Sequence, residues 1–364
     1  MKEKCLFLVN TPYQLMIAIN LRKTEYANYD ADVVITDNIS DHKDLLDSVR
    51  CVGIFENVIA YNIKELYPDK NSVALVRRLF GDKDIFDKAY DYYLFANLDH
   101  GASGIYRMLR KRNRHIKAIM FEDGYASYSG WYSDFLTMYG SIPFDGNVYK
   151  RLILKTWFHR LVDNVFCHVE KMFVFNPSIM TYKPSFRVER MKPIDVKNNE
   201  LVETYNRIFK YDPSVDSYKE PIIFLEESYY ADGYNVNDVE IVEKIASIVG
   251  KEKIFIKTHP RNPENRFEKL GYKTNKNTSI PWEVICMNID LSEKTLITIA
   301  SVAAIVPATM LGKKYNGILL MKMIPDDSYL KKNITNLYEK VCEEHSRLHL
   351  VKTMQELEEC ISEQ

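Results

Sequence analysis

The sequence lacks the cysteine patterns that bind zinc or form redox-active pairs. None of its cysteines forms a Cys-x-x-Cys motif with another, so neither a zinc ribbon nor a dithiol site is indicated. Unpaired cysteines, one of them in a short apolar run, are typical of a reducing compartment, and we expect a cytoplasmic protein. The six cysteines stand at positions 5, 51, 167, 286, 342 and 360.

Long apolar segments are absent as well. No run approaches the roughly 18 apolar residues that a membrane-spanning helix needs. The apolar stretch from Cys5 to Val9 is too short for the core of a signal peptide, and it is typical of a first β-strand. The sequence also has no internal repeat and no low-complexity tract.

Neither sign of charge is in excess. The chain has 49 Lys and Arg against 50 Asp and Glu, a formal net charge of −1, so we expect no nucleic-acid partner. A hydrophobic fraction of 46% fits a soluble globular protein. The 364 residues suffice for two ordinary domains with their own cores.

Strand-like and helix-like segments alternate along the chain. Such alternation predicts largely parallel sheets covered by helices, an α/β fold. A stretch rich in Pro, Lys, Asp and Asn at 183–220 separates two such series, so we expect one domain at 1–185 and another at 186–364. The predicted strands are 6–9, 32–36, 92–96, 116–121, 172–175, 221–225, 254–257, 295–300, 317–321 and 348–351, and the clearest predicted helices are 12–21, 198–208, 236–249, 282–288 and 354–362.

Two carboxylates and a glycine follow the predicted strand 116–121, as Glu122-Asp123-Gly124. The carboxyl ends of parallel strands are where open α/β sheets bind ligands. A carboxylate there can act as a general base, and a neighbouring carboxylate can raise its pKa by repulsion between like charges. An ordinary acidic turn accounts for the same residues.

The predicted strand 254–257 ends in Lys257-Thr258-His259-Pro260-Arg261. A histidine can hold a proton near neutral pH and give it to a leaving phosphate. Proline fixes the backbone after it, and the two cations favour an anionic nucleotide. The alternative is a surface turn with solvated charges.

Two further segments suit a nucleotide. Glu283 lies in the first turn of a predicted helix, where it can accept both hydroxyls of a ribose or simply match the helix dipole. Thr298 and Ser301 stand at the end of a strand and open toward a helix, which suits a phosphate or a plain helix cap.

Together these motifs resemble the bacterial sialyltransferases. That superfamily carries an acidic-acidic-Gly motif, then His-Pro, then Ile-Pro…Glu, then a serine-rich phosphate motif. Here these are 122–124, 259–260, 280–283 and Ser301, and the opening Asn10-Thr11-Pro12-Tyr13-Gln14-Leu15 is most similar to glycosyltransferase family 52. The family's phosphate motif has two adjacent hydroxyl residues, whereas Val302 stands at the second position here.

The resemblance implies a GT-B fold, with two Rossmann-like lobes facing a central cleft. It implies an inverting transferase that uses CMP-sialic acid, with no metal or other cofactor, and that adds sialic acid to galactose on a lipooligosaccharide or capsule glycan. The N-terminal lobe would bind the acceptor and supply the base, and the C-terminal lobe would bind the donor.

The resemblance also implies roles for single residues. Asp123, with Glu122 beside it, would be the base, and His259 the acid or the cation that stabilises the leaving phosphate. The backbone at Lys257 and Thr258 would read cytosine, and Glu283 would hold the ribose. The other donor-binding candidates are Pro260, Arg261, Thr298 and Ser301, and the acceptor or cleft candidates are Thr11, Gln14, Gly124 and Glu226.

The chemistry is consistent with a metal-free site. The anomeric carbon of sialic acid tends toward an oxocarbenium-like transition state, and a phosphate leaving group needs little beyond charge neutralisation. No Asp-x-Asp triplet lies in a loop suited to bind a metal. Two alternatives remain: a GT-B transferase for another nucleotide sugar, and a non-catalytic glycan- or nucleotide-binding protein.

Residues 106–117 contain six cations and no acidic residue. They would either dock the protein on the inner face of the cytoplasmic membrane, near a lipid-linked acceptor, or form a solvated helix face. The sequence leaves the oligomeric state open, a homodimer included.

Overall fold

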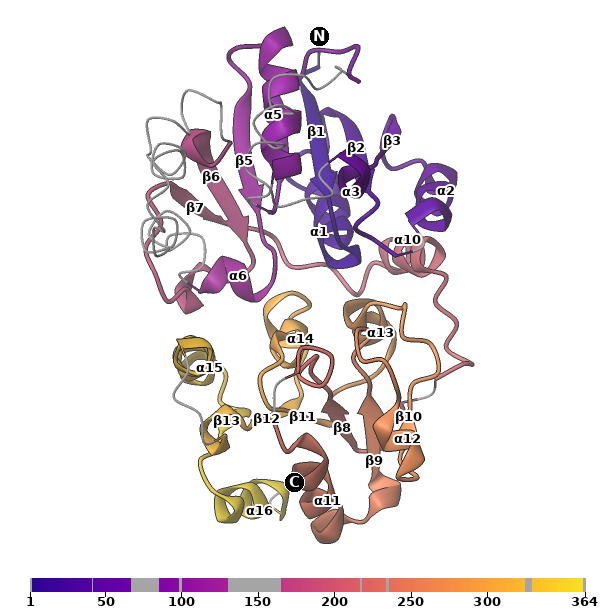
Figure 1. The fold of residues 1–364 in the computed structure, drawn as a ribbon, viewed down its shortest axis with the longest axis vertical. Coiled ribbons are helices and arrows are strands. Elements are labelled where there is room, and N and C mark those ends of the chain that lie inside the picture. The colour runs from indigo at the N-terminus through magenta and orange to yellow at the C-terminus, as the bar shows by residue number, and fades with distance from the viewer. Residues whose placement is uncertain are drawn as a thin grey trace, which may run out of the picture. The chain divides into compact units, whose positions relative to one another are not determined.

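The computed structural model describes residues 2–40, 42–66, 85–97, 100–129, 165–216, 218–233, 236–324 and 329–362. The chain folds into two compact units, residues 1–192 and residues 193–364. Each unit is built around its own sheet, with helices packed against it (Figure 1).

The N-terminal unit contains a seven-stranded sheet in the order β3-β2-β1-β4-β5-β6-β7. Every neighbouring pair of strands in it is parallel. Its strands are β1 (Lys4–Val9), β2 (Asp30–Thr36), β3 (Val58–Tyr61), β4 (Tyr92–Phe95), β5 (Lys117–Phe121), β6 (Val169–Val174) and β7 (Arg187–Arg190), and its described α-helices are α1 (Pro12–Lys23), α2 (His42–Val52), α3 (Ile63–Leu66), α5 (His100–Arg112) and α6 (Tyr125–Tyr128).

The C-terminal unit contains a six-stranded parallel sheet in the order β10-β9-β8-β11-β12-β13. Its strands are β8 (Ile222–Leu225), β9 (Ile254–Lys257), β10 (Lys273–Thr274), β11 (Thr295–Thr298), β12 (Asn316–Leu319) and β13 (Leu348–Leu350). Its α-helices are α10 (Asn199–Phe209), α11 (Asp238–Val249), α12 (Arg266–Lys269), α13 (Trp282–Asn288), α14 (Val306–Thr309), α15 (Tyr329–Glu344) and α16 (Met354–Ser362).

Both sheets reverse their strand order once, and this decides where a ligand can bind. The reversal lies between β1 and β4 in the first sheet and between β8 and β11 in the second. In such doubly wound sheets ligands bind at the carboxyl ends of the strands beside this reversal. The predicted motifs at 10–15 and 122–124 directly follow strands, and those at 257–261 and 298–301 begin at the last residue of a strand.

The strands form where the sequence is apolar without alternation. Five of the six residues of β1 and all four of β8 are buried. Burial on both faces is expected for parallel strands with helices on either side. The first helix begins at Pro12. Proline has no backbone N–H, but an N–H in the first turn of a helix has no partner within the helix, so no helical hydrogen bond is lost there. The Thr11 side chain accepts from Gln14 N as an N-cap.

The expected two Rossmann-like lobes are confirmed, but the domain boundary lies later than the predicted 185. Residues 187–190 form β7 and pair with β6, so they complete the first sheet. Their polar sequence, Arg-Val-Glu-Arg, suits an edge strand and hides it from a search for apolar runs.

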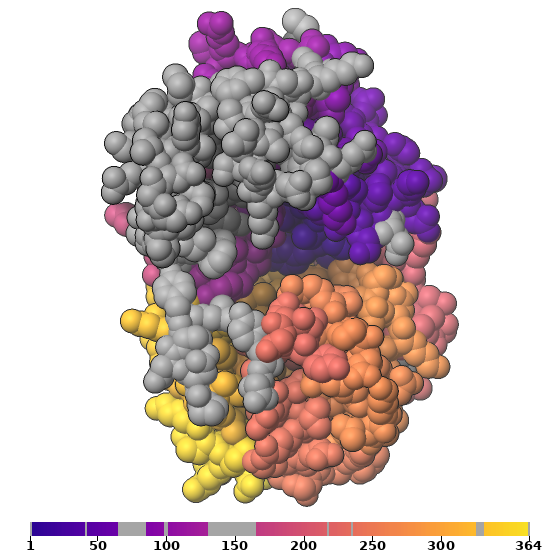
Figure 2. Space-filling view, in the orientation of Figure 1, coloured from indigo at the N-terminus to yellow at the C-terminus, as the bar shows by residue number. Residues whose placement is uncertain are grey.

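The turn at 230–233, after β8, is exposed. Figure 2 shows one face of the molecule in space-filling form, with the described residues of the C-terminal unit in salmon to yellow. No helix within the described ranges is long and apolar enough to span a bilayer.

Candidate active site

Asp123 is held in place at the end of β5. Its Oδ1 accepts a hydrogen bond from Gln14 Nε2 at 2.8 Å, and its backbone N–H donates to Ser127 Oγ at 2.7 Å. The residue is half-buried, so its carboxylate combines fixed geometry with access to solvent. A carboxylate in this state can accept a proton from a hydroxyl group.

Gln14 joins the ends of three strands. Its Oε1 accepts from Asn10 N at 2.7 Å, while its Nε2 donates to Asp123 and to Asn97. These residues follow β1, β4 and β5, on both sides of the strand-order reversal. The sequence prediction included Gln14 and missed Asn97, whose place directly after an apolar strand is the signal that could have found it.

Glu122, predicted among the catalytic residues, is buried, with 2% of its surface exposed. Its carboxylate accepts from Tyr13 Oη at 2.6 Å, from Phe175 N at 2.9 Å and from the Tyr128 hydroxyl. Burial raises the pKa of Glu122 to about 7. Of the two carboxyl groups in this motif, Glu122 is therefore the one whose pKa is raised. Its three donors indicate a residue that positions the turn.

Thr11 and Gly124 each have a role in the local fold. The Thr11 hydroxyl caps α1. Gly124 has φ 57° and ψ −135°, a combination that side chains disfavour, and it lets the chain turn from β5 into α6. Both predictions of an acceptor contact stay predictions.

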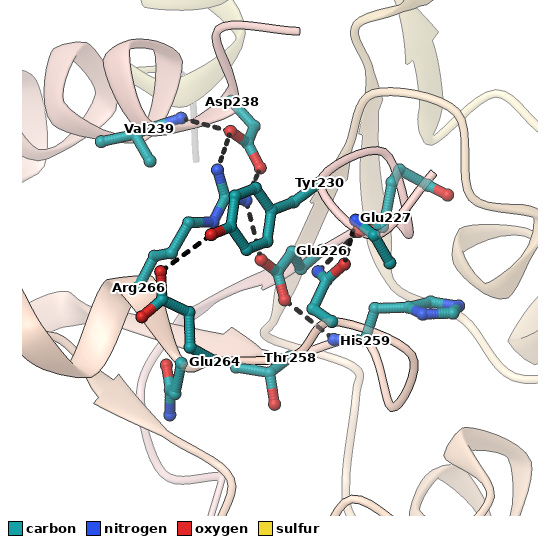
Figure 3. Close-up of polar contacts among 12 residues, drawn as sticks. Glu226, Glu227, Tyr230, Asp238, Val239, Thr258, His259, Glu264 and Arg266 are labelled. Atoms are coloured by element: carbon teal, nitrogen blue, oxygen red, sulfur yellow. Dashed lines mark hydrogen bonds and ion pairs between the residues drawn. The ribbon is translucent and has the colours of Figure 1, made fainter. Parts of the chain in front are cut away.

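His259 is fixed through its backbone and its ring. Its N–H donates to Glu226 Oε2 at 2.9 Å (Figure 3), and its Nδ1 accepts from the Arg261 N–H at 3.2 Å. Because Nδ1 is an acceptor, the proton of the neutral imidazole lies on Nε2. Burial, with Arg261 and Lys257 adding to it, lowers the pKa of His259 to about 4.

The low pKa changes the expected role of this histidine. The sequence predicted an acid or a cation, whereas the imidazole of the free protein is neutral at neutral pH. A neutral ring with its proton on Nε2 is a hydrogen-bond donor. The nearby cation is Lys257, which is buried and has its pKa lowered by burial to about 8.

The backbone next to His259 is already used within the fold. The Thr258 N–H donates to Asn275 Oδ1 at 2.7 Å, and the Lys257 carbonyl accepts from Glu226 N at 3.0 Å. The Thr258 N–H therefore has a partner within the fold, and the cytosine contact of the backbone at Lys257 and Thr258 stays a prediction.

Glu226, predicted to line a cleft, is buried instead. Its other oxygen, Oε1, accepts from Arg266 Nη2 at 3.0 Å. Arg266 also binds Asp238, and its guanidinium lies over the Tyr230 ring, 4.4 Å from the ring centroid (Figure 3). The sequence prediction missed Arg266 and Asp238, since neither is near a strand end.

Thr298 and Ser301 lie beside the reversal in the second sheet, as expected for a phosphate seat. Both hydroxyls are already hydrogen-bonded to the carboxyl group of Glu227. Thr298 Oγ1 donates to Glu227 Oε1 at 3.1 Å, and the Ala300 N–H and the Ser301 hydroxyl donate to the same group. Burial raises the pKa of Glu227 to about 7. A carboxyl group of the protein is therefore already bound where a phosphate was predicted.

Glu283 occupies the first turn of α13, as predicted, and is largely buried. Burial raises its pKa, while the nearby Lys257 opposes the shift. Arg261 is exposed and binds Ser228 Oγ at 2.6 Å and Asp232 at 3.4 Å, so part of its charge is paired. Pro260 is exposed.

A pocket of about 400 Å³ borders Thr258, His259 and Pro260. This volume lies within the range of roughly 300–1,000 Å³ that is usual for small-molecule sites. Among the residues that the structure describes, no group of three or more His, Cys, Asp or Glu side chains could hold a metal ion.

Comparison with known proteins shows the family of this chain. The model of the family described as Alpha-2,8-polysialyltransferase (POLYST) matches residues 5–306. The chain belongs to the alpha-2,8-polysialyltransferase family. No curated protein matches the sequence.

Solved structures share the fold of this family member at low identity. An alpha/beta-galactoside alpha-2,3-sialyltransferase from Photobacterium phosphoreum has a TM-score of 0.54 and 12% identity, over 96% of this chain and 98% of that one. The GT-B domain of a sialyltransferase from Photobacterium damselae has a TM-score of 0.50 and 16% identity, over 92% and 97%. A UDP-GlcNAc 2-epimerase from Methanocaldococcus jannaschii has a TM-score of 0.51 and 14% identity, over 100% and 92%.

The fold is therefore GT-B, and the family identifies the protein as a glycosyltransferase of the sialyltransferase type. The epimerase has the same fold and another activity, so fold alone does not select the reaction. The expected resemblance to bacterial sialyltransferases is confirmed, and the family that matches is the polysialyltransferase one. Family and fold support transfer of sialic acid from a nucleotide sugar to a glycan.

Proposed function

We propose that the protein is an inverting, metal-independent sialyltransferase that moves sialic acid from CMP-sialic acid to a terminal sugar of a bacterial lipooligosaccharide or capsule glycan. The observation that carries the proposal is the pair of side chains held at two strand ends, Asp123 and His259, in a member of this family. Asp123 is a fixed, accessible carboxylate, and His259 is a fixed, neutral imidazole beside the buried cation Lys257.

Asp123 is the proposed base. It accepts the proton of the acceptor hydroxyl while the hydroxyl oxygen attacks the anomeric carbon of sialic acid. The bond from that carbon to the phosphate oxygen breaks, and its electron pair leaves with CMP. Base catalysis of this kind contributes about 10²–10⁴-fold.

His259 is the proposed partner of the leaving phosphate. Its Nε2–H donates a hydrogen bond to the phosphate oxygen on which charge develops, and Lys257 adds positive potential. Glu283 would hold the ribose, Thr298 and Ser301 would bind the phosphate, and the pocket beside His259 would receive part of the donor. These groups neutralise the leaving group without a metal ion.

The acceptor sugar has two candidates. The sequence resemblance favours galactose. The name of the matching family favours sialic acid as the acceptor, joined through an α-2,8 linkage.

A transfer assay tests the proposal. The full chain is incubated with CMP-sialic acid and either a galactoside or a sialylated oligosaccharide, with and without excess EDTA. We expect CMP release that depends on an acceptor and survives EDTA. No transfer to either acceptor would refute the proposed function, and loss of transfer in EDTA would refute its metal independence.

A contact with the membrane is a separate part of the proposal. At the end of α5 and the start of β5, Lys111, Arg112, Arg114 and Lys117 are exposed, whereas Arg107 and Arg110 are half-buried. Cations near an anionic bilayer contribute about 1 kcal/mol each. Co-sedimentation with phosphatidylglycerol vesicles should weaken when the four exposed cations are replaced by Gln, and unchanged binding would leave them a solvated face.

A further inference from the structure

The buried carboxylate of Glu226 contacts the backbone of His259 and no solvent. Its side chain is 1% exposed, so a substrate cannot reach it. It follows β8 directly, at the strand next to the reversal of strand order. The residue therefore stands at a ligand-binding edge while facing the interior of the unit.

Both oxygens of this carboxylate are used. Oε2 accepts the His259 N–H at 2.9 Å, and Oε1 accepts Arg266 Nη2 at 3.0 Å. A buried carboxylate needs such partners, because an uncompensated charge in the interior costs several kcal/mol. Hydrogen bonds to a charged group are also roughly twice as strong as neutral ones.

Arg266 is itself anchored. It donates to both oxygens of Asp238, at 3.1 and 2.5 Å, in the first turn of α11. Its guanidinium lies over the Tyr230 ring, and the Tyr230 hydroxyl donates to Glu264 at 2.9 Å. Figure 3 shows Arg266 bonded to both Asp238 and Glu226, with the Tyr230 ring beside its guanidinium.

The ring of His259 is fixed by a different bond, from the Arg261 N–H to Nδ1. The two bonds together set the position of the loop and the direction of the imidazole. Nε2–H is the donor that remains to meet a ligand. A misplacement of about 1 Å in such a group can lower a rate about 10²-fold.

We propose that Glu226, held by Arg266, is a positioning residue that fixes the loop of His259 and so aims its Nε2–H at the phosphate of the donor. The proposal rests on the proposed role of His259 in sialyl transfer. Glu226 acts through the histidine and does not touch the substrate.

Glu226→Gln is the first test. The amide has the same shape but offers one oxygen, so it cannot accept from both Arg266 and the His259 N–H. We expect kcat for sialyl transfer to fall by about tenfold or more while KM for the acceptor stays unchanged. The matched control is Glu293→Gln, an exposed carboxylate of the same unit that lies outside this network and outside the pocket beside His259, which should leave kcat unchanged.

A double substitution separates positioning from a general structural role. In a His259→Ala background there is no imidazole to aim, so adding Glu226→Gln should cost no further activity. A further tenfold loss in that background, or a wild-type kcat in Glu226→Gln alone, would overturn the proposal.

An NMR titration gives a readout that does not depend on activity. The imidazole signal of His259 is identified by its absence in His259→Ala. Loosening of the loop in Glu226→Gln should admit water to the ring and move its pKa up toward 6.5. If that variant does not fold, Arg266→Lys, which keeps the charge and loses the fork of donors, should shift it in the same direction.

The outcomes separate two failures. Wild-type protein that neither binds CMP nor transfers sialic acid would refute the proposed function, while the titration would still report on the loop. An imidazole pKa that stays at its wild-type value in Glu226→Gln and in Arg266→Lys would refute the positioning role by itself.

Discussion

At the scale of single residues, Asp123 and Glu122 are neighbours with different tasks. Asp123 is half-buried and bonded by Gln14, whereas Glu122 is buried among three donors. Acid–base work needs a group that a substrate can reach. The division between the two carboxylates follows from burial, which the sequence does not show.

Replacement of Asp123 tests the proposed base. In Asp123→Asn the side chain still accepts from Gln14 but cannot take a proton from a hydroxyl. Sialyl transfer should fall by about 10²–10⁴-fold with CMP affinity retained, as measured by initial rates and calorimetry. Near-normal turnover in this variant, with Glu122→Gln inactive, would assign the role to Glu122.

His259 should be neutral when transfer occurs at neutral pH. Its pKa is lowered from 6.5 to about 4 because the folded protein disfavours the protonated ring. The free energy of unfolding therefore falls as the pH falls from 6.5 to 4. Transfer should therefore not decline as the pH rises through 6.5.

Removal of this imidazole tests its part in the chemistry. His259→Ala should lower kcat by about 10²-fold or more and weaken CMP binding only modestly. Glu283→Ala should do the reverse, with weaker CMP binding as the main effect. A His259→Ala protein with a lower melting temperature and full specific activity would show that this histidine only stabilises the turn.

At the scale of elements, the turn after β5 ties together three parts of the N-terminal unit. Glu122 accepts from Tyr13 in α1, Tyr128 in α6 and Phe175 just after β6. Each donor satisfies a carboxyl group that would otherwise be costly to bury. The turn is therefore a point where stability and the position of Asp123 depend on the same bonds.

The raised pKa of Glu122 makes stability depend on pH. The value rises from 4.5 to about 7, so the folded state holds this proton more tightly than the unfolded one. Between these two pKa values the free energy of unfolding should fall as the pH rises, by about 1.4 kcal/mol for each step of one in pH. Glu122→Gln should flatten this slope in urea unfolding at pH 5 to 8, while Glu56→Gln, an exposed control, should keep it.

The sequence predicted the central strands better than the edges. Strands buried on both faces are continuous apolar runs, and β9, α13 and α16 begin and end where expected. The edge strand β7 is polar and the edge strand β10 has two residues, so neither gives such a signal. Helices α2 and α15 were missed as well.

The site was predictable in its parts and not in its contacts. A polar residue after an apolar strand identified Asp123, His259, Thr298 and Ser301. The bonds that define their states join residues far apart in sequence: Gln14 to Asp123 over 109 positions, Glu226 to His259 over 33 and Glu227 to Thr298 over 71. Only the order of strands in the sheets brings these pairs together.

At the scale of the whole molecule, each unit has a sheet and a core of its own, and the proposed donor contacts all belong to residues 193–364. Multidomain proteins can unfold in more than one step. A ligand that binds one native unit raises the stability of that unit alone.

CMP should therefore shift part of the thermal unfolding profile. At a concentration of about 100 Kd it should stabilise the C-terminal unit by about 2.7 kcal/mol, while UDP and GDP should have little effect. Scanning calorimetry with each nucleotide measures this. Stabilisation by UDP in place of CMP would favour a transferase for another nucleotide sugar, and no shift with any nucleotide would contradict the donor assignment.

The carboxylate of Glu227 at the Thr298 and Ser301 hydroxyls has a consequence for selectivity. A phosphate that uses these hydroxyls must first displace a carboxyl group that is covalently part of the protein, and therefore present at a high local concentration. Inorganic phosphate, which brings no other contacts, competes poorly under these conditions. A nucleotide that binds as proposed would offset the displacement with its ribose and base, so we expect these bonds to select against the small anions that are abundant in a cell.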